Sequence, residues 1–181
     1  MRVIAGSLKG RRLKTPTWEG LRPTSDKLRE TLFNILAPRV AGARVLDGYA
    51  GTGATGIEAL SRGAAFVAFV ERDRRAQALL AENLALCGVE DGYAIIRAEM
   101  ARAMDQLRAA GLTFDIALLD PPYGQSADAE LAAVAELLAP GGIAVVEHAR
   151  RQPAAERAGR LLRSRDVRSG DSALTFYEAA V

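Results

Sequence analysis

The chain has 181 residues, of which 49% are apolar and 25% charged, and its formal net charge is +2. This length fits one domain, and the apolar share supports a packed core, which excludes wholesale disorder. No apolar run approaches the ~20 residues of a membrane span, and residues 1–13 lack the apolar stretch of a secretory signal. One cysteine, Cys87, and one histidine, His148, exclude a disulfide framework and a Cys/His metal cluster. We therefore expect a cytoplasmic protein without a metal or a membrane partner.

Charge is distributed unevenly along the chain. Residues 1–29 carry a net charge of +6, residues 30–149 carry −7, and residues 150–181 carry +3. Two basic ends around an acidic middle favour a polyanionic partner that both ends contact. A solubilising surface is the alternative interpretation of the same pattern.

Strand-like and helix-like patterns alternate through the middle of the chain. Short apolar and β-branched runs predict strands at 44–47, 65–71, 93–97, 114–120 and 143–147. Helical composition and spacing predict helices at 24–36, 55–61, 74–86, 100–110 and 127–138. The runs 161–167 and 173–179, joined by a Ser-Gly-Asp turn, predict a closing β-hairpin. This order predicts a parallel sheet with helices on both faces and at least one antiparallel strand.

Polar residues and a glycine mark two helix boundaries. Thr24 or Ser25 can cap the first helix, and Asp73 can cap the helix at 74–86. Gly88 follows that helix, at the position where glycine commonly ends one.

A glycine-rich turn follows the first predicted strand. Gly51, Gly53 and Gly56 form a G-x-G-x-x-G pattern that leads into a helix, and Glu71 ends the next strand twenty residues after Gly51. Glycine lets the backbone approach a ligand closely, and a carboxylate at position 71 can accept hydrogen bonds from ribose hydroxyls. The pattern fits a nicotinamide dinucleotide or another adenosine cofactor. The alternative is a plain tight turn beside a surface glutamate.

The residues between strand and glycine turn favour a cationic cofactor. Asp47, Gly48 and Tyr49 lie there, and the Asp47 carboxylate would repel a pyrophosphate and attract an ammonium or a sulfonium. S-adenosylmethionine carries both cations and no phosphate. Glu99, just after the third strand, is placed either to accept from the adenine amine or to cap the following helix.

The sequence Asp120-Pro121-Pro122-Tyr123 directly follows the fourth predicted strand. Ligands bind outside the carboxyl ends of parallel strands, so we expect this segment to lie beside the Asp47 loop. Two prolines remove two backbone donors, and the corner can grip an NH₂ group with carbonyl and carboxylate oxygens. Such a grip suits methylation of an exocyclic base amine, with Tyr123 stacked on the base. A structural turn with a buried tyrosine is the alternative.

These motifs resemble class I S-adenosylmethionine-dependent methyltransferases that methylate amines. Further segments, at 3–6, 9–13, 22–26, 29–34, 56–64 and 170–177, resemble the bacterial 16S rRNA guanine-N2 methyltransferases of the RsmD type. The resemblance implies a seven-stranded, mostly parallel sheet with a C-terminal antiparallel hairpin and a small N-terminal β-hairpin. It also implies one domain over 1–181, with a basic arm at 1–23 and a catalytic core at 24–181. The implied partner is 16S rRNA in the small ribosomal subunit or its assembly intermediate, and we expect a monomer.

The resemblance and the residue chemistry together assign three sets of site residues. The predicted catalytic residues are Asp120, Pro121, Pro122 and Tyr123. The predicted cofactor-binding residues are Asp47, Gly48, Tyr49, Gly51, Gly53, Glu71 and Glu99. The predicted RNA-phosphate contacts are Lys9, Arg11, Arg12, Lys14, Arg22, Lys27 and Arg29.

Some residues leave their roles open. Gly48 stands where we expect a larger apolar residue, and Thr55 where an aliphatic one is common. Trp18 can stack on a base or simply pack, and His148 is either a general base or a bystander near the site.

Four other functions remain. An adenine-N6 DNA methyltransferase would use the same amine site but usually needs a target-recognition insert, for which we expect no room. A protein-glutamine methyltransferase typically has Asn in place of Asp120. A non-catalytic RNA-binding assembly factor would not need three site carboxylates, and a dinucleotide oxidoreductase conflicts with Asp47.

Overall fold

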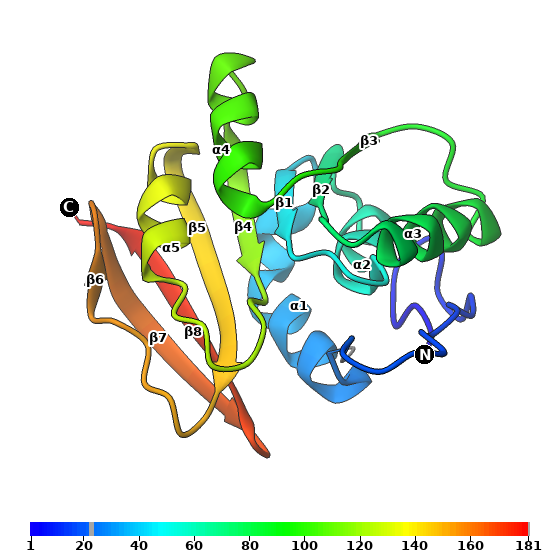
Figure 1. Ribbon diagram of the computed structural model, residues 1–181, viewed down its shortest axis with the longest axis horizontal. Coiled ribbons are helices and arrows are strands. Elements are labelled where there is room, and N and C mark those ends of the chain that lie inside the picture. The colour runs from blue at the N-terminus through cyan, green and yellow to red at the C-terminus, as the bar shows by residue number, and fades with distance from the viewer. Residues whose placement is uncertain (22–23, 181) are drawn as a thin grey trace.

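The structure is a computed structural model that describes residues 1–21 and 24–180. Within these residues, eight strands form one sheet in the order β3-β2-β1-β4-β5-β8-β7-β6 (Figure 1). The strands are β1 (Arg44–Gly48), β2 (Phe66–Val70), β3 (Tyr93–Ile96), β4 (Phe114–Leu119), β5 (Leu138–Ala149), β6 (Arg157–Ala158), β7 (Leu161–Ser169) and β8 (Ser172–Ala179). The first five strands are parallel, and β8 runs antiparallel to both β5 and β7. The prediction of a mostly parallel sheet that ends in an antiparallel hairpin is confirmed.

Helices cover both faces of this sheet (Figure 1). They are α1 (Asp26–Val40), α2 (Ala54–Ser61), α3 (Arg74–Leu86), α4 (Met100–Ala109) and α5 (Asp128–Ala135). The apolar side chains of α1, α2 and α3 share one core with Val45 of β1, whereas those of α4 and α5 share a second core with Leu46. Successive side chains of a strand point to opposite faces, so the continuously apolar central strands supply both cores.

The predicted helix caps agree with the structure. Ser25 caps α1, since its hydroxyl accepts the Leu28 backbone N–H at 3.2 Å. Asp73 caps α3 through the backbone N–H groups of Arg75 and Ala76. Gly88 has a φ of +68° just beyond α3, the left-handed conformation in which glycine ends a helix.

The C-terminal half of the sheet differs from the prediction in two places. The eighth strand, β6, has two residues paired with Leu161 and Leu162, too few for any hydrophobic period to show. Strand β5 begins at Leu138, where a helix was predicted, because Leu138 pairs with Phe114 across a register irregularity. Helix α5 therefore ends at Ala135.

The expected N-terminal β-hairpin is reduced to one antiparallel bridge between Arg2 and Arg12. Hydrogen bonds from Val3 N–H to the Arg11 carbonyl and from Gly10 N–H to the Val3 carbonyl, each 2.9 Å, complete the turn. Val3 and Leu13 are buried in the same core as α1 and α2. Residues 1–13 therefore pack onto the described part of the core, and the division into arm and core stays a prediction.

Strands β1 and β4 are the point at which the strand order reverses, since β2 and β3 lie to one side and β5 to the other. In sheets of this kind a ligand-binding crevice opens outside the carboxyl ends of the strands at this point. No helix among residues 1–21 and 24–180 is long and apolar enough to cross a membrane.

Candidate active site

A cavity of about 430 Å³ lies at the carboxyl ends of β1, β2, β4 and β5. Its lining includes the predicted cofactor residues Asp47, Tyr49, Gly51, Glu71 and Glu99 and the whole Asp120–Tyr123 segment. The two loops that were expected to lie side by side thus share one cavity. This size suits a small-molecule ligand with room for a second group.

Asp47 is the second-last residue of β1 and is only 4% exposed. Its Oδ2 accepts the Gly56 backbone N–H at 2.8 Å, at the start of α2. Burial raises the pKa of Asp47 to about 8, although the hydrogen bond from Gly56 opposes that shift. Below about pH 8 the Asp47 carboxyl group therefore holds a proton, which a cationic ligand group in the cavity would displace.

The glycine turn is held to β2 through Glu71. The Gly51 backbone N–H donates to Glu71 Oε2 at 2.9 Å, and the Asp73 N–H donates to Oε1 at 2.8 Å. The carboxylate therefore fastens the turn as well as lining the cavity. Each oxygen keeps a second acceptor site, so ribose contacts by Glu71 stay a prediction.

Two predicted cofactor glycines shape this loop without lining the cavity. Gly53 precedes α2 with a φ of +80°, and a Cβ there would come within 2.1 Å of Leu80 Cδ1. A Cβ at Gly48 would lie 2.6 Å from Leu119 Cδ2, so Leu119 and Met100 fill the space expected for a larger side chain at 48. In this geometry, the two glycines allow close packing around the loop and do not contact the cavity.

Tyr49 and Glu99 both line the cavity. Tyr49 is a non-glycine residue with a φ of +62°, a strained conformation of a kind that concentrates at functional sites. Its hydroxyl donates to Glu130 Oε1 at 3.1 Å. Glu99 is the N-cap residue of α4, the position that the capping interpretation expects, but its side chain makes no capping hydrogen bond. Its carboxylate is exposed and lies 3.4 Å from Arg72 Nη1.

The Asp120–Tyr123 corner follows β4 directly. The Asp120 backbone N–H donates to the Gly48 carbonyl at 3.4 Å, and the Pro122 carbonyl accepts the Gln125 N–H at 3.1 Å. Burial raises the pKa of Asp120 well above its usual range, and the nearby charges of Glu147 and Asp47 add to that shift. Tyr123 lines the cavity and is 58% exposed, so the buried-tyrosine alternative is wrong.

Two further lining residues, Glu147 and His148, were not assigned to the site from the sequence. Glu147 comes directly after the last β5 residue that pairs with β4, and its Oε2 accepts the Thr24 hydroxyl at 2.8 Å. The sequence did contain a signal for Glu147, because this acid is the last residue of the strand predicted at 143–147, as Asp47 and Asp120 are of theirs. His148 also lines the cavity, but Nε2 lies 2.8 Å from Thr175 Oγ1 and Nδ1 lies 3.0 Å from the Ala149 carbonyl oxygen. Both ring nitrogens are thus engaged by the protein.

The predicted RNA-phosphate contacts fall into separate groups. The exposed ones are Lys9, Arg11, Arg12, Lys14 and Lys27. Lys14 is paired with Glu82, and Arg11 Nη1 reaches the Leu86 carbonyl at 3.4 Å. Arg22 lies outside the described residues.

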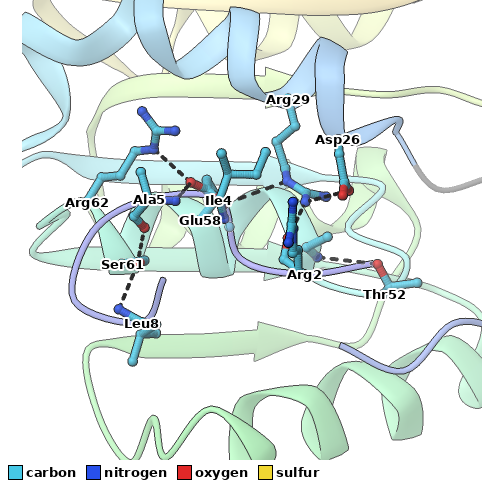
Figure 2. A network of polar contacts seen from close by, with 12 residues as sticks. Arg2, Ile4, Ala5, Leu8, Asp26, Arg29, Thr52, Glu58, Ser61 and Arg62 are labelled. Carbon is cyan, nitrogen blue, oxygen red and sulfur yellow. Dashed lines mark hydrogen bonds and ion pairs between the residues drawn. The ribbon is translucent and has the colours of Figure 1, made fainter. Parts of the chain in front are cut away.

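The prediction for Arg29 is wrong. Its side chain has no exposure, and Figure 2 shows it between Asp26, the Arg2 backbone and Glu58. A buried guanidinium that already serves two carboxylates cannot reach an RNA phosphate. Arg29 is a structural residue.

The fold and the site define a class I, S-adenosylmethionine-dependent methyltransferase. The chain belongs to the family described as "Conserved hypothetical protein 95", whose model matches residues 1–178. It is 37% identical over 181 residues to "Putative rRNA methyltransferase YlbH" of Bacillus subtilis, covering 98% of each chain. It is 45% identical over 123 residues to Escherichia coli "Ribosomal RNA small subunit methyltransferase D", covering 68% of this chain and 60% of that one.

A solved structure agrees with this assignment. "Putative methyltransferase yhhF from Escherichia coli" superposes with a TM-score of 0.83 at 34% identity and covers 99% of this chain and 97% of that one. The resemblance to RsmD-type methyltransferases is thereby confirmed.

Proposed function

We propose that this protein transfers the methyl group of S-adenosylmethionine to the exocyclic N2 amine of a guanine in 16S rRNA. The observation that carries the proposal is the single cavity shared by the Asp47 loop and the Asp120-Pro121-Pro122-Tyr123 corner. A methyl donor and an acceptor amine must meet in one space, and these are the two segments whose chemistry suits them. The relatives from Bacillus subtilis and Escherichia coli are both named as rRNA methyltransferases, which supports an RNA substrate.

The residues present fit S-adenosylmethionine. Asp47 supplies a buried carboxylate for an ammonium or sulfonium, and Glu71 lines the wall with oxygens suited to ribose hydroxyls. A pyrophosphate in the same place would meet both acids. When bound, the cofactor supplies an electrophilic methyl group on a positively charged sulfur.

The Asp120 corner fits the target amine. The lone pair of a base NH₂ group is delocalised into the ring, which makes the amine a poor nucleophile. Asp120 and the Pro121 carbonyl would accept its two N–H bonds, which localises the lone pair and aims it at the donor. Exposed Tyr123 would stack on the base after it leaves its helix. Most of the acceleration would then come from holding two reactants in line.

The exposed cations at 9–14 and Lys27 would hold RNA phosphates without reading sequence. We place the reaction in the bacterial cytoplasm, on assembling small subunits, and expect a monomer.

The test is methyl transfer from labelled S-adenosylmethionine to small subunits that lack the modification, followed by nucleoside analysis. We expect N2-methylguanosine in the wild type and none with Asp120→Ala, whose cofactor affinity should stay within about threefold, a change of less than 1 kcal/mol. Naked 16S rRNA as a second substrate shows whether the assembled particle is needed. N6-methyladenosine would overturn the substrate, and cofactor binding without transfer to any rRNA would favour a non-catalytic factor.

A further inference from the structure

Glu147 lies beside Asp120 at the edge of the cavity. Leu119 of β4 pairs in register with Val146 of β5, so the residues that follow them, Asp120 just after β4 and Glu147 within β5, are neighbours. Both line the cavity. Adjacent strands lie about 4.8 Å apart, which is close enough for two side chains to contact one planar ligand.

One oxygen of Glu147 is already held in place. The Thr24 hydroxyl donates to Oε2 at 2.8 Å, from the segment that leads into α1. This bond fixes the orientation of the carboxylate and leaves Oε1 as the acceptor for a ligand. Burial raises the pKa of Glu147, and the charge of Glu147 adds to the rise in the pKa of Asp120, which agrees with two carboxyl groups close to each other.

We propose that Glu147 selects guanine by accepting the N1–H of the target base while Asp120 accepts an N–H of the neighbouring N2 amine. This inference rests on the proposed function and names the residue that discriminates between bases. Guanine presents N1–H and the N2 amine side by side, two donors for two carboxylates. Adenine presents an N1 lone pair beside its amine, and the ionised carboxylate of Glu147 has no proton to place between the two acceptors.

The inference explains why an enzyme with a general amine grip would reject adenine. A site built to hydrogen-bond a substrate N–H strongly rejects an analogue that lacks it, because the buried acceptor is left unpaired. Asp120 alone grips any NH₂ group, so specificity has to come from a second contact.

The experiment uses small subunits reconstituted with 16S rRNA in which the mapped target guanosine is replaced. 2-Aminopurine keeps the 2-amine but lacks N1–H, whereas 6-thioguanosine keeps N1–H and loses only the O6 oxygen. For the wild type we expect kcat/KM to fall at least about 10²-fold with 2-aminopurine and much less with 6-thioguanosine. Glu147→Gln should reduce the ratio of kcat/KM for guanine to that for 2-aminopurine to about tenfold or less. The glutamine amide can accept the N1–H of guanine through its oxygen, or donate an N–H to N1 of 2-aminopurine.

The controls separate recognition from folding and from cofactor binding. Glu136→Gln changes an exposed acid just after α5 that does not line the cavity, and it should leave both rates unchanged. Thr24→Val removes the bond that holds Glu147 and should give a smaller loss of discrimination. S-adenosylmethionine affinity should be the same in all variants.

Equal use of 2-aminopurine and guanine by the wild type overturns the inference, even if Glu147→Gln fails to fold. So does a Glu147→Gln variant that lowers both rates equally or weakens cofactor binding. Absence of transfer to the guanine-containing control particles would instead overturn the proposed function.

Discussion

The Arg29 and Glu58 side chains face each other in the protein interior, with Arg29 Nε 3.7 Å from Glu58 Oε2 and neither side chain exposed. Glu58 also accepts the backbone N–H groups of Ile4 and Ala5, at 2.8 and 3.0 Å, and the Arg62 Nε–H at 2.8 Å (Figure 2). One buried carboxylate on α2 thus fastens the N-terminal residues of the chain to two helices.

Arg29→Ala should lower the free energy of unfolding by about 3–5 kcal/mol, because it empties a fully buried site, removes one of the two cations that pair with buried Glu58 and leaves the Arg2 carbonyl without its donor. Arg39→Ala is the matched control, since Arg39 is paired with Glu178 at 2.7 Å but both side chains are about 40% exposed. Arg39→Ala should lower the free energy of unfolding by at most about 1 kcal/mol. Chemical denaturation measures both, and equal losses would contradict the role of the buried pair.

Reversal of charge at Arg11 and Arg12 should weaken RNA binding and make its salt dependence shallower. The slope of log K against log salt should fall by about 0.7–0.9 for each phosphate that the double variant no longer neutralises. Arg102→Glu, an exposed change on α4, should leave that slope unaltered. Filter binding at several salt concentrations checks this, and an unchanged slope in the double variant would reject the basic segment as the RNA contact.

Gly6 and Gly10 offer a matched pair of substitutions. Both have a φ of +85°, but a Cβ at Gly6 would come within 1.8 Å of the Ser61 carbonyl oxygen, whereas one at Gly10 meets nothing within 4 Å. Gly10→Ala should cost about 1–2 kcal/mol from the left-handed conformation alone. Gly6→Ala should cost more and speed hydrogen exchange at the Leu8 amide, which is bound to Ser61 Oγ at 2.9 Å. Equal exchange in the two variants would show that residues 5–8 do not dock on α2.

Affinity for S-adenosylmethionine should rise with pH up to about 8. The pKa of Asp47 is raised from 3.8 to about 8 in the folded protein, so its folded form holds a proton that the unfolded chain loses near pH 4. Without cofactor, Asp47 therefore lowers the free energy of unfolding progressively as the pH rises from about 4 to about 8. A cationic ligand favours the carboxylate, and binding releases the proton, with a limit of about tenfold in affinity per pH unit.

Asp47→Asn should remove the part of the pH dependence that comes from Asp47. Any titration of the ligand's own amine affects wild type and variant alike. Isothermal titration across the same pH range compares the two proteins. A parallel pH profile in wild type and variant would show that Asp47 does not face the cofactor's charge.

The central architecture could be predicted because strands buried on both faces are continuously apolar and because helix caps have specific side chains. Phe66–Val70 and Asp73 are examples in which local chemistry decides the structure. Strand β6 could not be predicted, since its two residues are recruited by β7 through tertiary pairing. The start of β5 could not be predicted for the same reason. Its first residues contain glycines, which indicate a turn, and only pairing with β4 makes the segment a strand.

The site was predictable where strand ends carry acids next to distinctive turns, as at Asp47 and Asp120. Arg29 was wrongly assigned to RNA binding because the count of charges ignored which face of the helix each residue lies on. It lies four, seven and eleven residues before Phe33, Leu36 and Val40, which are all buried on α1. Glu147 was missed because its importance depends on the β4–β5 register, which sequence alone does not fix.

The most direct measurement of the central claim is the single-turnover rate of methyl transfer by Asp120→Asn to unmodified small subunits at saturating S-adenosylmethionine. Asparagine keeps the shape of Asp120 but replaces one acceptor oxygen with a donor, so the amine can no longer be gripped by oxygens alone. We expect the rate to fall by about 10²–10³-fold, the loss typical of one preorganised transition-state contact. A rate within about threefold of the wild type, less than 1 kcal/mol in barrier height, would contradict the assignment of Asp120 to the reacting amine.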